Sequence, residues 1–63
     1  MQAHKVPTKI INEAQKRARK AGECVVVCWD DDYLKYYYVP ESNYDPDWDN
    51  EGVLEVDPRG YLL

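Results

Sequence analysis

The chain has 63 residues, of which 32% are charged and 44% hydrophobic, and its formal net charge at pH 7 is −4. A chain of this length buries only about 60% of the surface of its unfolded state, so it has little interior in which to enclose an active site. No stretch approaches the ~18 apolar residues of a membrane span, and the polar start MQAHK predicts no signal peptide, so we expect a cytoplasmic protein.

Positive and negative residues are divided along the chain. Residues 1–22 contain six lysine and arginine residues against Glu13, a net charge of +5. Residues 23–63 contain two basic residues against eleven carboxylates, a net charge of −9. This division predicts two surfaces of opposite sign, which bear on partners and association rates rather than on the fold.

Residues 8–21 are predicted to form a helix. Pro7 suits a first helical turn, and Gly22 is the usual type of residue just after a helix ends. Aliphatic and small residues form one narrow stripe at helical spacing: Ile10, Ile11, Ala14, Ala18 and Ala21. Such a stripe suits close packing on a flat sheet, and it can cover only one face of that sheet.

Two apolar runs on either side of three aspartates are predicted strands, residues 23–29 and 33–39, the second ended by Pro40. The aspartates lack the glycine that would fix the turn, so two registers stay open. In one register, Tyr33 and Tyr37 lie on the same face as Val25, Val27 and Trp29. In the other register, Leu34, Tyr36 and Tyr38 lie on that face. Either register leaves five or six apolar side chains on one face that the helix cannot cover.

The rest of the chain reads as a polar loop over residues 40–52 and a third strand over residues 53–57. Asp57-Pro58-Arg59-Gly60 has the signature of a type I turn, which could return residues 61–63 as a fourth strand. The prediction is therefore a single α+β domain over residues 1–63, with one N-terminal helix packed on a three- or four-stranded antiparallel sheet.

The uncovered sheet face needs a partner surface. Either the loop folds back with Tyr44 and Trp48, or a second protein covers the face, and we favour a second copy, which predicts a homodimer. The sheet-face interface would then contain Tyr33, Lys35, Tyr36, Tyr37 and Tyr38.

Catalysis, metals and cofactors are not expected. His4 is the one histidine and stands in a terminal segment, so we interpret it as a solvated residue, and no catalytic residue is assigned. Cys24 and Cys28 would lie ~13 Å apart on a strand, too far for a disulfide. Zinc would need two further ligands, so we interpret both cysteines as small apolar side chains.

Aromatic residues among carboxylates are the strongest functional feature of the sequence. The predicted partner-binding residues lie in or beside the loop: Tyr44, Asp45, Asp47, Trp48, Asp49 and Glu51. Trp48 would be the anchor, and the aspartates would steer the loop onto a basic surface. We expect a small non-catalytic regulator or inhibitor of a basic, nucleic-acid-binding protein, of the kind that phage or mobile elements direct against host defence.

Two alternatives stay open. Asp45, Asp47 and Asp49 match the first half of a calcium-binding loop, although Val56 stands where a bidentate glutamate belongs. Lys16 and Lys20 on the helix could contact nucleic-acid phosphates, but the negative charge of the other residues makes direct nucleic-acid binding the weaker interpretation.

Overall fold

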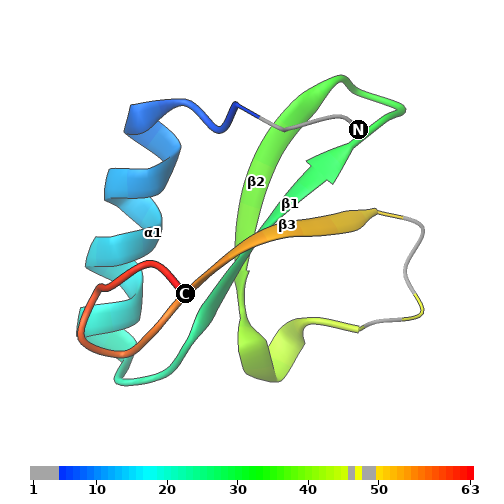
Figure 1. The fold of residues 1–63 in the computed structure, drawn as a ribbon. Coiled ribbons are helices and arrows are strands. Elements are labelled where there is room, and N and C mark those ends of the chain that lie inside the picture. Colours follow the sequence, from blue (N-terminus) through cyan, green and yellow to red (C-terminus); the bar gives the residue numbers. More distant parts are fainter. Residues whose placement is uncertain (1–4, 46, 48–49) are drawn as a thin grey trace.

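The computed structural model describes residues 5–45, 47 and 50–63. Its elements are helix α1 (Thr8–Ala21), strands β1 (Val25–Asp30), β2 (Lys35–Pro40) and β3 (Glu51–Val56), and a short 3-10 helix η1 (Glu41–Asn43). The strands form an antiparallel sheet in the order β2-β1-β3, and α1 and η1 lie on opposite sides of it (Figure 1). The predicted α+β fold, one helix on an antiparallel sheet, is confirmed.

Helix α1 has the ends that its sequence predicts, and it buries the middle of the predicted stripe, whereas Ile10 and Ile11 are half-buried and Ala21 is exposed. The Pro7 carbonyl accepts a hydrogen bond from the Ile11 amide at 3.1 Å, and the helix ends at Gly22, whose φ of 70° is left-handed. Ala14 and Ala18 are fully buried, because their small side chains let the helix backbone approach the sheet. Among the residues that the structure describes, no helix combines the length and the apolar character that crossing a membrane requires.

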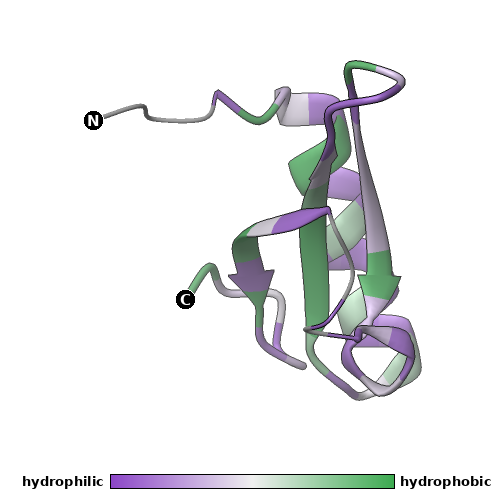
Figure 2. Ribbon diagram, turned by 90° about the vertical axis from the view of Figure 1, so that its right-hand side faces the viewer, coloured by the Kyte–Doolittle hydropathy of each residue, from purple (hydrophilic) through white to green (hydrophobic). Residues whose placement is uncertain are grey.

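The core lies between α1 and one face of the sheet. Its fully buried members from the strands are Val25 and Val27 of β1 and Val56 of β3, packed on the two buried alanines of α1. Hydrophobic residues are concentrated along the central strand β1 (Figure 2). The fully buried side chains that β1 contributes on the helix side are thus two valines, which suit a thin sheet-and-helix core.

The β1–β2 hairpin adopts the second of the two open registers. Val27 pairs with Tyr38 and Trp29 with Tyr36, so these residues share the helix side of the sheet. The Asp30 carboxylate accepts hydrogen bonds from the amides of Asp32 (2.9 Å) and Tyr33 (3.2 Å) and builds the turn. The turn therefore includes Tyr33 and Leu34, which the sequence placed in the strand; Leu34 has a φ of 53°.

Strand β3 starts two residues earlier than predicted, and the fourth strand is reduced to a bridge. Between Val27 and Cys28 the β1–β3 register shifts, so Val53 is an extra residue, a bulge, in β3. After the turn that starts at Asp57, one bridge joins Val56 to Leu62, and the Leu63 amide donates to the Glu55 carbonyl at 2.8 Å.

Candidate functional site: an acidic pocket on the second sheet face

The sheet face opposite α1, called here the second face, is already covered at its centre in a single chain. The strand register places Val26 and Cys28 of β1 on this face with Tyr37 of β2. Val26 is 8% exposed and Cys28 is fully buried. Burial of these two side chains therefore requires no second copy, and the homodimer stays a prediction.

The loop after β2 folds back over this face. A Cβ atom added to Gly52 would lie 3.0 Å from the Tyr44 hydroxyl and 3.1 Å from a Val26 methyl group, so Tyr44 lies across Gly52 and beside Val26. At the far end of the loop the Asn50 amide donates a 2.8 Å hydrogen bond to the Tyr37 hydroxyl. The sequence left two ways to cover this face, the loop or a second protein, and the structure shows the loop with Tyr44. Trp48 lies outside the described residues.

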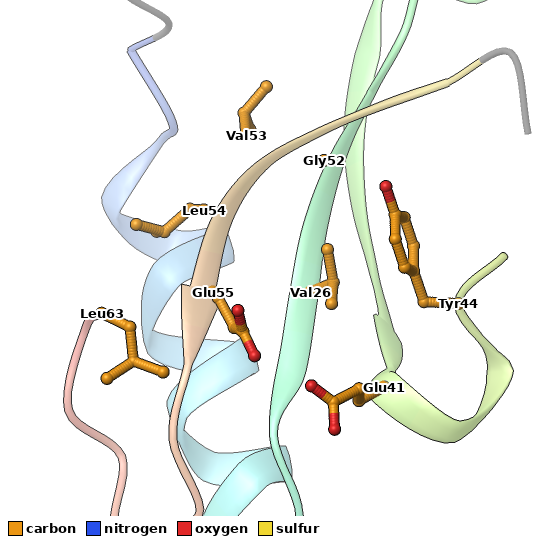
Figure 3. Close-up of a pocket in the computed structure, with 8 residues that line it drawn as sticks. All are labelled: Val26, Glu41, Tyr44, Gly52, Val53, Leu54, Glu55 and Leu63. Carbon is orange, nitrogen blue, oxygen red and sulfur yellow. The ribbon is translucent and has the colours of Figure 1, made fainter. Parts of the chain in front are cut away.

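A pocket of about 410 Å³ opens between the loop and β3 (Figure 3). Val26 lies between its two sides. Glu41 and Tyr44 line one side, and Glu55 and Leu63 line the other. The pocket is thus apolar and aromatic in its walls and acidic at its rim.

Strand pairing brings the two glutamates of this rim together. The Glu41 amide donates to the Cys24 carbonyl at 2.9 Å, which continues the β1–β2 pairing one residue beyond Val25. Glu55 lies opposite Val26 on the other side of β1. Both carboxylates consequently point toward each other across β1 (Figure 3).

Cys24 completes a cluster with these glutamates. Its Sγ atom and one carboxylate oxygen each from Glu41 and Glu55 lie within 4.8 Å of one another. A hydrogen bond that the protonated Glu41 carboxyl donates to Glu55, followed by desolvation and the neighbouring negative charges, raises the pKa of Glu41. Desolvation, followed by the charges of Glu41 and Glu55, raises the pKa of the Cys24 thiol.

These shifts determine the chemistry that the cluster supports. Three ligand atoms at this spacing could hold a metal ion, but a metal would first have to displace the proton of a thiol whose pKa is raised. The same raised pKa makes Cys24 a poor nucleophile at neutral pH. What remains is a pair of facing carboxylates with room for one positive charge between them. Sequence reasoning missed the cluster, because Cys24 meets Glu41 and Glu55 only through strand pairing.

Of the predicted partner-binding residues that the structure describes, Tyr44 belongs to this pocket and the others are exposed outside its lining. Tyr44 lines it, and Glu51 is exposed at the start of β3. Asp45 and Asp47 are exposed in the loop, where the Asp47 amide donates to the Asp45 carboxylate at 2.9 Å. Asp49, like Trp48 and His4, lies outside the described residues, and their roles stay predictions.

The predicted sheet-face interface is divided among three places. Tyr36 and Tyr38 pack against the core on the helix side, whereas Tyr37 lies on the second face. Tyr33 is 75% exposed in the hairpin turn, with the Lys35 ammonium 5.6 Å from its ring centre. The five residues therefore do not form one continuous surface.

The structure also bears on the two alternatives. Val56, at the twelfth position of the calcium-loop pattern, is fully buried in the core and offers no side-chain oxygen to a cation. A second pocket of about 220 Å³ lies between α1 and β2, lined by Lys16, Arg17, Lys20, Glu13 and Tyr38.

The chain matches no protein-family model, no curated protein and no solved structure. What the pocket can bind is therefore inferred from its own side chains.

Proposed function

We propose that the protein is a small non-catalytic binding protein, a regulator or inhibitor, that engages a basic surface of a partner protein. The binding surface is the second face together with its loop. The observation that supports this proposal is the charge separation across the fold. On one side of the sheet, α1 exposes Lys9, Lys16, Arg17 and Lys20 to solvent.

The other side of the sheet has the opposite sign. Glu41 and Glu55 border the pocket, and Asp45 and Asp47 are exposed in the loop beside it. Tyr44 supplies an aromatic surface among these charges. Carboxylates around an aromatic residue speed and orient association with a basic surface, while the ring supplies contact area.

A partner that itself binds DNA or RNA presents a basic groove of this kind. An acidic protein that occupies the groove excludes the nucleic acid by charge and volume. A phage or mobile-element inhibitor of host defence would act in this way, and this biological setting is part of the proposal.

The test is affinity capture with the tagged wild-type protein and with an Asp45→Asn/Asp47→Asn/Glu41→Gln/Glu55→Gln variant. Partners that bind through the acidic surface should be retained by the wild type at low salt, lost with the variant, and released by a DNA or RNA oligonucleotide. The control variant is Asp31→Asn/Asp32→Asn, which removes negative charge from the hairpin turn instead of from the acidic surface. Equal capture of basic proteins by all three proteins would contradict the proposal.

The pocket between α1 and β2 favours a second candidate, direct nucleic-acid binding. Lys16, Arg17 and Lys20 gather around Tyr38 there, and basic groups beside an aromatic ring suit a phosphate backbone. This candidate predicts binding to an oligonucleotide at low salt that Lys16→Glu or Lys20→Glu weakens. The absence of such binding would eliminate it and would leave the first proposal intact.

A further inference from the structure

The pocket on the second face has a polarity that restricts what can fill it. Among the described residues that line it, the charged side chains are Glu41 and Glu55, so its rim carries negative charge without a compensating cation. The rest of the lining includes the side chain of Val26 and the ring of Tyr44, with Leu63 on the side of Glu55 (Figure 3). An occupant must therefore combine a positive head with an apolar body.

The two carboxylates are held where a single positive charge fits. One carboxylate oxygen of each lies within 4.8 Å of the other and of the Cys24 Sγ atom. Two carboxylates this close repel each other, and a cation placed between them would offset that repulsion. Glu23, near Glu41, adds to the negative charge at this end of the face.

The apolar wall fits the stem of a long basic side chain. Lysine and arginine lay their methylene groups along apolar surface and keep the charged head at a polar edge. Val26 lies beside the facing glutamates, between Glu55 and the Tyr44 ring (Figure 3). A stem against Val26 and the Tyr44 ring would bring its head to Glu41 and Glu55, and the ring face itself attracts a cation.

We propose that this pocket receives one lysine or arginine side chain from the surface of the partner protein, with the cationic head between Glu41 and Glu55 and the stem against Val26 and Tyr44. The inference rests on the proposed function and identifies this pocket as the place where the basic surface of the partner is bound. Charge complementarity selects this occupant over an acidic or purely apolar group. It also makes Glu41 and Glu55, rather than the loop aspartates, the residues on which recognition depends most.

The test is a titration of the ¹⁵N-labelled protein, followed by amide chemical shifts, with three short capped peptides at low salt. One peptide contains a single lysine, one a single arginine, and one norleucine, which keeps the stem without the ammonium. The lysine or arginine peptide should shift the amides of Val26, Glu41, Tyr44 and Glu55, and the norleucine peptide should not. Comparison of the lysine peptide with the arginine peptide shows which of the two head groups the pocket prefers.

Two matched variants separate the pocket from general electrostatic attraction. Glu41→Gln/Glu55→Gln should weaken peptide binding about five- to tenfold, as expected for the loss of two ion pairs near the surface. Asp45→Asn/Asp47→Asn removes the same charge from the adjacent loop and should weaken it less than about twofold. The amide spectrum of each variant shows directly whether it is folded.

The outcomes are distinguishable. If the aspartate variant loses binding while the glutamate variant keeps it, the pocket inference is overturned and the proposed function stands. If no basic peptide shifts any amide on the second face or the loop, both are overturned. If Zn²⁺ alone shifts the same amides and Cys24→Ser abolishes that response while the peptides have no effect, the cluster is a metal site and the inference is wrong.

Discussion

The two cysteines provide a direct test of whether the chain covers its own second face. Cys28 is fully buried on this face, whereas Cys24 is half-buried beside its edge. Desolvation raises the pKa of both thiols, so a difference in their reactivity reports mainly on access. We expect a neutral thiol reagent to modify Cys24 in the folded protein and to reach Cys28 only after the structure opens.

The size of the difference follows from the stability of a small domain. A chain of this length rarely has a net stability above about 3–5 kcal/mol, and each ~1.4 kcal/mol corresponds to a tenfold change in the open population. If reaching Cys28 requires global unfolding, its modification should be slowed by up to roughly 140- to 4,000-fold relative to the unfolded chain. The rate is measured by mass spectrometry on Cys24→Ser and Cys28→Ser variants, each of which leaves one thiol.

Protein concentration separates the two ways of covering Cys28. Protection that stays constant as the protein is diluted means that the loop supplies the cover, as the structure shows. Protection that disappears on dilution would mean that a second copy supplies it, and the predicted homodimer would gain support. If Cys28 reacts within about tenfold of Cys24 at every concentration, the reasoning that the second face is covered is wrong.

Three further changes have expected outcomes. Gly60→Ala should lower the free energy of unfolding, measured in urea, by about 1–2 kcal/mol, because its φ of 91° is one that L residues rarely adopt, while the Arg19 guanidinium can swing away from the new Cβ. Gly22→Ala should cost less, because its φ of 70° lies closer to the left-handed helical region; a larger loss at Gly22 would contradict this reasoning. Val27→Ala should cost about 2–3 kcal/mol, since two fully buried methyl groups are lost and a cavity remains; a loss below about 1 kcal/mol would mean that the core collapses around the site. The pKa of Glu41 is raised from its ordinary value of 4.5, so the folded state binds the Glu41 proton more tightly than the unfolded state does. The stability that this contributes is complete below pH 4.5 and is lost as the pH rises through the folded-state pKa. Glu41→Gln should remove that part of the pH dependence in thermal melts, and an unchanged profile would contradict the raised pKa of Glu41.

The helix is determined by local sequence, and so its bounds could be predicted. Pro7 and Gly22 act through their own backbone preferences at its ends. Ala14 and Ala18 lie on one stripe because helical spacing is a property of the segment itself, and both are buried as expected. The α+β class also follows from local signals, one helical period followed by runs of β-branched and aromatic residues.

The hairpin register and the acidic pocket required the tertiary structure. The Asp30 side chain takes Tyr33 and Leu34 into the turn, and this decides which tyrosines face α1. Glu41 and Glu55 are far apart in the sequence and meet only because β2 and β3 flank β1.

The sequence alone thus determined the helix, the strand composition and the separation of charge, because each depends on neighbouring residues or on simple counts. The tertiary structure decided that the loop covers the second face, with Tyr44 across Gly52 and Asn50 bonded to Tyr37. A local pattern shows that a face is apolar, but which segment covers it depends on the path of the backbone. Contacts between distant segments are set by the packing of the whole chain, which no single stretch of residues encodes.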